Sequence, residues 1–272
     1  MTQNNFAFSD FANNKFYSAV NQTLIDLADL SNEKRVVDLA CGTGMVTRQI
    51  AETLKNAKDS VIIAMDHSQD MLKLAAEELK DISCTAIEFV DSKVEQISDQ
   101  IKDQVDVIFF CNAIHYVSNK DEILNEINNL LRTGGKLSLN TSFYNGAHPP
   151  ETELFARKWM IKALRTLRKD YGLKPNKAEK VESRKQLTPL DYETLLKQHG
   201  FIIKKQLVNK IPVPLKGWMD ISSFKDFISG VMPGIPLTKA SKCLTTAVTQ
   251  TFDELNVKAI PRNWLNIIAI KE

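Results

Sequence analysis

Several common sequence features are absent from this chain of 272 residues, and each absence excludes a class of protein. Its four cysteines, Cys41, Cys84, Cys111 and Cys243, form no C-x-x-C pair, so we expect neither a zinc site nor a disulfide framework. No apolar run approaches the roughly 20 residues that span a bilayer, and the first residues lack the pattern of a signal peptide. A formal net charge of only +2 gives no general case for nucleic acid binding. We therefore expect a cytoplasmic protein with reduced thiols.

Glycine is also scarce, and its placement is informative. Two of the ten glycines, Gly42 and Gly44, follow an apolar run that ends in an acid, Val36-Val37-Asp38, and no other glycine occurs before Gly134. Glycine lets the backbone approach a ligand closely and tolerates positive φ. The residues from Met45 onward have a helical pattern. Strand, glycine turn and helix together predict a nucleotide-binding corner of a doubly wound sheet.

The glycine pattern narrows the choice of nucleotide. A dinucleotide fingerprint reads G-x-G-x-x-G, whereas Thr47 stands at the third glycine position here. This difference disfavours a nicotinamide or flavin enzyme, since the third glycine permits close packing of helix on strand. No Gly-Lys-Ser/Thr follows, which excludes a P-loop. What remains is D-x-x-x-G-x-G, with Asp38 on the strand itself.

Later segments repeat the pattern of a strand that ends in a polar residue. Val61–Asp66 and Ala86–Asp91 both end in an acid, and Val105–Asn112 and Gly135–Asn140 are further apolar runs. An acid at the end of the second strand, here Asp66, accepts hydrogen bonds from ribose hydroxyls in nucleotide-binding folds. Apolar runs that alternate with helical patterns from 34 to 143 predict βαβ units and a parallel sheet.

The glycine turn and the three strand-end acids resemble the class I S-adenosylmethionine-dependent methyltransferases. Asp38, Ala40, Gly42 and Gly44 match the first motif of that family, with Ala40 in place of the commoner glycine. The resemblance is strong over 34–143 and weaker beyond. It implies an α/β fold with a doubly wound, seven-stranded, mostly parallel sheet, the Rossmann-like methyltransferase fold, in which the last strand inserts antiparallel between strands five and six.

The same resemblance implies a domain organisation. Residues 1–143 would comprise an N-terminal cover helix and the cofactor-binding core, and 144–187 a helical insertion. Residues 188–272 would supply the last strands of the core, with a helical lid insertion at 212–258. Lids of this kind exclude water from a reaction.

The family further implies S-adenosylmethionine as cofactor and a set of residues that bind it. Asp66 would hold the ribose, Asp91 and Ser92 the adenine edge, and Tyr17 of the leading helix 11–30 the methionine end. The full expected set is Tyr17, Asp38, Ala40, Cys41, Gly42, Gly44, Asp66, His67, Met71, Asp91, Ser92 and Asn112. Tyr17 and its neighbour Phe16 could equally pack the leading helix onto the core.

A general base is needed only when the acceptor atom of the substrate is protonated, and histidine titrates nearest to neutrality. His115 follows the fourth strand at the sheet edge where ligands bind, and His148 lies in a turn-rich loop beyond the fifth strand. His115 is therefore the best-placed candidate for the catalytic residue, with His148 and Tyr144 as rivals. It could instead orient the site or contact the cofactor without acting as a base. No spacing of histidines and carboxylates predicts a metal site.

The insertions are expected to select the substrate. A helix over 151–171 should have an apolar stripe, at Met160, Leu164, Leu167 and Tyr171, and a basic stripe, at Lys158, Lys162, Arg165 and Lys169. The basic stripe is either a solvated face or a surface for an acidic carrier protein, phosphate or a membrane. The aromatic and aliphatic residues between Trp218 and Phe252 favour an apolar or aromatic small molecule.

These features predict an enzyme that transfers a methyl group to an O or N atom of a small, apolar or aromatic biosynthetic metabolite. Within the same class, the acceptor could instead be a carboxylate, a carbon atom or a carrier-bound acyl group. Two hypotheses from other classes of protein stay open: an NAD(P)-dependent oxidoreductase, and a non-catalytic protein that keeps the fold. We expect a small-molecule substrate, no nucleic acid partner and no membrane span.

Overall fold

The computed structural model describes residues 9–57, 59–176, 182 and 185–272. Its contacts divide the chain into two compact units, each built from three segments. Unit 1 comprises residues 1–17, 146–185 and 210–263, and unit 2 comprises residues 18–145, 186–209 and 264–272. Most of the two expected insertions belongs to unit 1, and their role as a lid stays a prediction. Within the described residues, no helix has the length and apolar character needed to cross a membrane.

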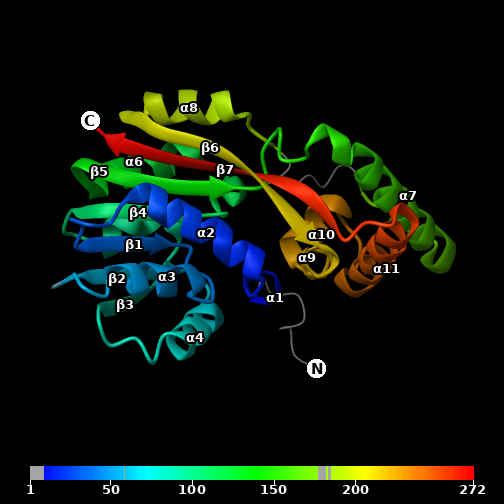
Figure 1. Cartoon of the computed structure of the whole chain (residues 1–272), viewed down its shortest axis with the longest axis horizontal. Coiled ribbons are helices and arrows are strands. Elements are labelled where there is room, and N and C mark those ends of the chain that lie inside the picture. The colour runs from blue at the N-terminus through cyan, green and yellow to red at the C-terminus, as the bar shows by residue number, and fades with distance from the viewer. Residues whose placement is uncertain (1–8, 58, 177–181, 183–184) are drawn as a thin grey trace. The chain divides into compact units, whose positions relative to one another are not determined.

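A seven-stranded sheet runs through the described residues in the order β3-β2-β1-β4-β5-β7-β6 (Figure 1). The strands are β1 (Arg35–Leu39), β2 (Val61–Asp66), β3 (Ala86–Asp91), β4 (Val105–Cys111), β5 (Leu131–Thr141), β6 (Phe201–Pro214) and β7 (Ala259–Lys271). The pairs among β1 to β5 are parallel, whereas β7 lies antiparallel to β5. The expected fold is confirmed, including the insertion of the last strand next to the fifth.

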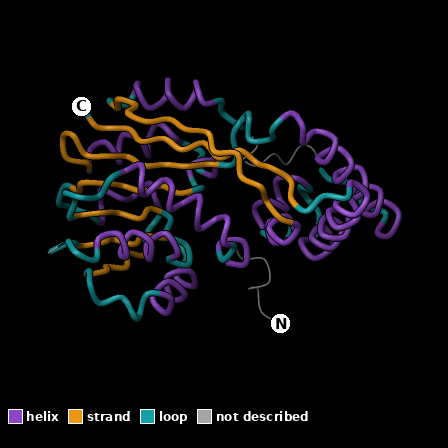
Figure 2. Tube along the Cα trace, in the orientation of Figure 1, coloured by secondary structure: helices purple, strands orange, loops and turns teal. Residues whose placement is uncertain are grey.

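Three helices of unit 2, those that follow Ser68, Asn119 and Thr188, begin with a side chain that accepts a hydrogen bond from an amide of the first turn. The helices of unit 2 are α2 (Lys15–Ala28, from residue 18 onward), α3 (Met45–Leu54), α4 (Gln69–Glu78), α5 (Ile97–Gln100), α6 (Lys120–Leu130) and α8 (Pro189–Gln198), with the short 3₁₀ turns η2 (Val94–Gln96) and η3 (Ile114–Tyr116). Thr188 and Asp191 form a reciprocal capping box ahead of Pro189, the first residue of α8. His199 is the C-cap of that helix. In Figure 2 the helices are purple, the strands orange and the loops teal.

The core of unit 2 explains why its strands are almost purely apolar. Leu24 of α2 and Ile50 of α3 pack with Val36, Ile62 and Phe109 of the sheet, and all five are fully buried. Parallel strands covered on both faces have no exposed side, so they lack the alternation of a half-buried strand. The edge strand β3 differs, since four of its six residues are exposed.

Unit 1 is mainly helical. It contains α1 (Ser9–Ala12), η4 (Pro150–Thr152), α7 (Glu153–Tyr171), α9 (Leu215–Ile221), α10 (Lys225–Val231) and α11 (Leu237–Leu255). α7 packs against α11: the indole Nε1 of Trp159 donates to the Leu244 carbonyl at 2.9 Å, and the rings of Phe155 and Phe252 meet edge to face at 5.6 Å. α7 ends at Gly172, whose φ of 66° is the left-handed geometry of a helix C-terminus.

The apolar stripe expected on α7 is wrong. The residues that α7 buries are Phe155, Trp159, Ala163 and Leu167, so only Leu167 was placed correctly. Leu164 is 39% exposed. Of the expected basic stripe, Lys158 and Lys162 both pair with Glu254 of α11, and their hydrogen bonds lower the pKa of that carboxyl to about 2. Two of the four cations therefore serve the contact between α7 and α11.

The aromatic residues of the second insertion build the core of unit 1. Trp218, Phe227 and Phe252 are all buried, and the ring of Trp218 meets those of Phe155 and Trp159 at 5.1 and 5.5 Å. Packing of a hydrophobic core is therefore enough to explain this aromatic content, so the composition says little about the substrate.

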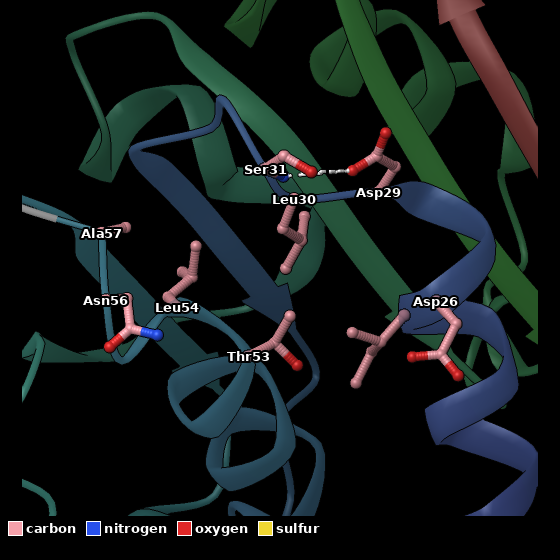
Figure 3. Close-up of a pocket in the computed structure, with 9 residues that line it drawn as sticks. Asp26, Asp29, Leu30, Ser31, Thr53, Leu54, Asn56 and Ala57 are labelled. Atoms are coloured by element: carbon pink, nitrogen blue, oxygen red, sulfur yellow. Dashed lines mark hydrogen bonds between the residues drawn. The ribbon is translucent and has the colours of Figure 1, made fainter.

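A pocket of about 420 Å³ lies in unit 2, at the amino edge of the sheet (Figure 3). Its lining comes from the end of α2, the loop before β1 and the end of α3, and comprises Ile25, Asp26, Asp29, Leu30, Ser31, Thr53, Leu54, Asn56 and Ala57. Asp29 accepts hydrogen bonds from the backbone and hydroxyl of Ser31 there. The residues that precede β1 and β2 form this pocket, so it lies at the edge opposite the strand-end acids.

Candidate active site

The strand-end acids of unit 2 meet at one edge of the sheet. β3, β2 and β1 are adjacent and parallel, and Asp66 pairs in register with Asp91. Asp38 lies beside Ala64, two residues before the end of β2. Carboxyl ends of parallel strands are where open α/β sheets bind ligands. Asp66 and Asp91 thus share the rim, while Asp38 lies one step deeper.

The turn after β1 is built from left-handed residues. Ala40, Gly42 and Gly44 have φ of 60°, 55° and 80°. A Cβ on Gly44 would come within 3.0 Å of the Cβ of Ala75, so glycine is required there for the turn to pack on α4. A Cβ on Gly42 would meet nothing within 4 Å. The turn therefore leaves open space beside Gly42, into which a ligand can approach the backbone.

Asp66 is held by two backbone donors. Its Oδ2 accepts from the amide of Gly42 at 2.9 Å, and its Oδ1 accepts from the amide of Ser68 at 3.0 Å. The residue is only 6% exposed. Backbone bonds of this kind fix the orientation of a carboxylate, leaving its remaining lone pairs to accept from hydroxyl donors. Met71 is half-buried in the first turn of α4, and His67 is exposed beside Asp66.

Asp38 is buried and bonded to the residue that breaks the dinucleotide fingerprint. The Thr47 hydroxyl donates to its Oδ2 at 2.6 Å, and Asp38 is 1% exposed. Burial raises the pKa of Asp38 to about 7, with the nearby Asp66 adding to the rise and the Thr47 bond opposing it. Thr47 thus has a specific role that the sequence did not reveal: it joins α3 to the acid of β1.

The end of β3 contributes one exposed and one buried residue. Asp91 is exposed, while Ser92 is buried and its amide donates to the Asp66 carbonyl at 3.1 Å. The ends of β2 and β3 are therefore fixed to each other at the rim.

The turn after β4 rests on a buried amide network that sequence reasoning missed. Asn112, at φ 51°, donates its amide to the side-chain Oδ1 of Asn140 at 2.9 Å. Asn140 Nδ2 donates in turn to Asn21 Oδ1 of α2 at 3.0 Å, and Asn112 Oδ1 accepts from the amide of Ser142 at 3.1 Å. Asparagine within an otherwise apolar strand, as at position 140, is the sequence feature that could have indicated it.

His115 lies in η3, just after this turn, and is 3% exposed. Its ring stacks on Phe143 with centroids 4.3 Å apart, and its Nδ1 is 3.1 Å from the Thr141 hydroxyl. That hydroxyl oxygen also accepts from the amide of Phe143 at 3.0 Å. The imidazole is therefore held in one orientation by stacking and by one hydrogen bond.

The other expected catalytic residues are divided between the units. Tyr144 belongs to unit 2 and is 2% exposed. His148 belongs to unit 1, where its Nε2 lies 3.2 Å from Nη1 of Arg262. Arg262 is 7% exposed, and its guanidinium lies over the ring of Trp218 at 5.8 Å. Arg262 did not figure in the sequence analysis.

Two aromatic residues of the leading helix lie in unit 1. Tyr17 is buried, with its ring 5.2 Å from Phe11. A Cβ on Gly217 of α9 would come within 2.6 Å of Phe16, so Phe16 packs directly on that helix. The packing role is therefore established for Phe16, while contact of Tyr17 with the cofactor stays a prediction. Among the described residues, no three His, Cys, Asp or Glu side chains are grouped to hold a metal ion.

A family model described as a methyltransferase domain matches residues 30–200. This range is more than half of the chain, and it contains the glycine turn, the strand-end acids and His115. The protein belongs to this methyltransferase family. The expected membership of the S-adenosylmethionine-dependent methyltransferases is thereby confirmed, and the nicotinamide-dependent reading is disfavoured.

Known proteins of similar sequence and fold agree with this assignment. Trans-aconitate 2-methyltransferase of Mycobacterium tuberculosis is 34% identical over 118 residues, which are 43% of this chain and 39% of that protein. The chain spans less than half the length of the first curated relatives it matches.

Solved structures show the same fold at low sequence identity. A Bacillus halodurans protein described as a putative methyltransferase has a TM-score of 0.59 at 17% identity, over 93% of this chain and 99% of that one. Phosphoethanolamine N-methyltransferase 2 of Haemonchus contortus has a TM-score of 0.58 at 17% identity, over 97% of this chain and 56% of that one. The latter was solved with S-adenosylhomocysteine.

Proposed function

We propose that this protein transfers the methyl group of S-adenosylmethionine to an oxygen or nitrogen atom of a small, apolar or aromatic metabolite. The observation that carries the cofactor in this proposal is the rim of unit 2, where the open turn at Gly42 adjoins the oriented carboxylate of Asp66. A turn with open space at Gly42 and an acid with preset lone pairs suit a nucleoside ligand.

The residues present fit the cofactor. Asp66 would accept the ribose hydroxyls, Asp91 and Ser92 would meet the adenine, and the Gly42 turn would approach the rest of the nucleoside. When bound, S-adenosylmethionine supplies the reactive methyl group, so the protein mainly positions the reactants. Asn112, whose position is fixed by its bond to Asn140, would line the adjoining side of the site.

His115 would act as general base. The Thr141 oxygen already accepts from Phe143, and it has a second lone pair for a proton on His115 Nδ1. In that tautomer His115 Nε2 holds the lone pair that would remove a proton from the acceptor. In the other tautomer, with the Thr141 hydroxyl donating, Nε2 is a donor, and His115 would only orient the substrate.

A carboxylate oxygen is a second candidate for the acceptor. The pairing of Arg262 with His148 in unit 1 places a buried cation beside an exposed imidazole, a combination that suits an anionic substrate group. The similar mycobacterial protein is named for methyl transfer to trans-aconitate, a carboxylic acid. Carbon atoms and carrier-bound acyl groups remain less supported alternatives.

Calorimetric titration with S-adenosylhomocysteine, with NADH run in parallel, tests the cofactor. Saturable binding of S-adenosylhomocysteine alone supports the proposal, whereas binding of NADH alone, or of neither compound, contradicts it. Acceptors are then sought by incubating the protein with S-adenosylmethionine and sets of phenols, amines and carboxylic acids, with methylated products detected by mass spectrometry.

The role of His115 has its own test. His115→Ala should lower turnover much more than it weakens cofactor binding, and Thr141→Val should shift the pH dependence of turnover. An equal loss of turnover and cofactor affinity in His115→Ala would make His115 a cofactor contact instead of a base.

A further inference from the structure

α7 has a second apolar face, directly opposite the one that packs on α11. Leu154, Ile161 and Leu164 are 46%, 41% and 39% exposed. They recur at intervals of seven and three residues, which places them on one side of a helix. Outward-facing positions of a helix in a globular protein are normally polar. This outward face therefore needs an explanation other than the packing of unit 1.

Arginine residues share the outward face. Arg157, Arg165 and Arg168 lie three or four residues from the exposed aliphatic residues and are themselves exposed. Between Leu154 and Lys169 the sequence has six basic residues and no acidic one. Glu254 engages Lys158 and Lys162, whereas the three arginines form no ion pair with any described residue. The outward face thus combines aliphatic side chains with positive charge that no carboxylate of the described residues pairs.

We propose that the outward face of α7, defined by Leu154, Arg157, Ile161, Leu164, Arg165 and Arg168, docks on a membrane surface that contains anionic lipid. From Leu154 to Arg168 the face is about 21 Å long at 1.5 Å per residue. Aliphatic side chains can enter the boundary between headgroups and acyl chains while arginines bind lipid phosphates. Charge complementarity selects anionic lipid over neutral lipid.

Two other occupants fit this face less well. A second copy of the chain would bring the same positive charges together, which is unfavourable. An acidic protein would satisfy the charge and could use the three arginines, but leucine is under-represented among the residues that carry the binding energy of protein interfaces. The outward face has no aromatic residue, and it is a convex helix surface, which a soft, flat bilayer can accommodate.

Co-sedimentation of the full-length protein with vesicles tests the proposal. We expect binding to vesicles of phosphatidylcholine mixed with phosphatidylglycerol, much weaker binding to phosphatidylcholine alone, and a loss of binding as salt is raised. The variant Leu154→Ser with Ile161→Ser and Leu164→Ser should bind at least about tenfold more weakly. The variant Arg165→Glu with Arg168→Glu should show a similar loss.

A matched control separates the local surface from the net charge. Lys197→Glu with Lys204→Glu makes the same change in net charge at exposed positions of unit 2, and it should alter vesicle binding by less than about threefold. Circular dichroism and titration with S-adenosylhomocysteine should be unchanged in all three variants, which keeps this test independent of the proposed enzymatic function.

Three outcomes would overturn the proposal. They are absence of binding to either kind of vesicle, equal loss of binding in the Lys197/Lys204 control, and binding to an immobilised acyl carrier protein without binding to vesicles. The last outcome would assign the outward face to an acidic protein partner.

Discussion

The turns after β1 and β4 leave the same edge of the sheet through a left-handed residue that is not glycine, yet they are stabilised differently. Ala40 begins the β1 turn at φ 60°, and Asn112 begins the β4 turn at φ 51°. The β1 turn is held by carboxyl groups, namely Asp66 on the Gly42 amide and Asp38 on Thr47. The β4 turn is held by neutral amides, through Asn140 and Asn21.

The difference separates the turn that we propose to bind the cofactor from the turn that supports the sheet. Carboxylates on one rim are costly in the absence of a ligand, because burial and mutual repulsion disfavour their charged forms. A neutral amide network is insensitive to pH and stabilises the fold without any ligand. We therefore expect changes at the β1 turn to alter ligand binding and pH response, and changes at the β4 turn to alter stability.

The largest expected effect comes from the buried acid of the β1 turn. Because burial raises the pKa of Asp38 from 3.8 to about 7, the folded state favours its protonated form. Its contribution to stability is complete below pH 3.8 and falls as the pH rises to about 7. This difference in pKa corresponds to about 4 kcal/mol. In urea unfolding without ligand, the free energy of unfolding of Asp38→Asn should not decline over this pH range. Parallel curves of this free energy against pH for wild type and variant would contradict the raised pKa of Asp38.

The amide network of the β4 turn gives the next effect. Asn140→Leu removes the bonds to Asn112 and Asn21 and leaves buried amide groups without partners, so we expect a loss of about 1–3 kcal/mol in the free energy of unfolding. Asn129→Leu, at an exposed position of α6, should change it by less than about 0.5 kcal/mol. Equal effects in the two variants would show that the network contributes nothing specific.

Asp66, the last residue of β2 and the acceptor for the Gly42 amide of the β1 turn, should control the affinity for the cofactor. Asp66→Ala removes the proposed ribose acceptor, and we expect S-adenosylhomocysteine to bind at least about tenfold more weakly, as for the loss of a charge-assisted bond. Asp70→Ala, at an exposed acid on the first turn of α4, is the matched control and should bind normally. Calorimetry measures both, and unchanged affinity in Asp66→Ala would refute the assignment of β2.

The smallest effect concerns the strained alanine. Glycine at position 40 would relieve the left-handed strain, at some cost in unfolded-state entropy, so Ala40→Gly should raise the free energy of unfolding by about 0.5–1 kcal/mol. Ala76→Gly in α4 should lower it by about 1 kcal/mol. The two substitutions are chemically identical, so opposite signs of their changes in the free energy of unfolding would identify backbone conformation as the cause. The same sign in both would exclude that cause.

The parallel half of the sheet could be predicted from sequence because its local patterns and its packing agree. β2 and β3 are short apolar runs that end at the expected acids, Asp66 and Asp91, and β1 ends at Leu39, one residue after Asp38. The start of α8 is marked in the sequence because Thr188, Pro189 and Asp191 give a complete capping signature. These features depend on neighbouring residues in the chain.

Features that depend on distant partners could not be predicted. The buried face of α7 is determined by its packing on α11. Ala163, a small and only weakly apolar residue, lies at the centre of that face. The length of β6, which continues to Pro214, is not indicated by its sequence, because most of its residues are exposed and lack the alternation of a half-buried strand. The bonds of Thr47 to Asp38 and of Asn140 to Asn21 join residues whose proximity only the fold creates.

The unequal burial of the four cysteines has a practical consequence. Cys41, Cys111 and Cys243 are buried, and burial raises the pKa of the Cys41 and Cys111 thiols, whereas Cys84 is exposed. An alkylating reagent should therefore modify Cys84 first. Cys84 precedes β3, whose six residues separate it from Asp91 by about 20 Å. A fluorophore attached there would report on unit 2 from the edge opposite the ligand, without any engineered residue.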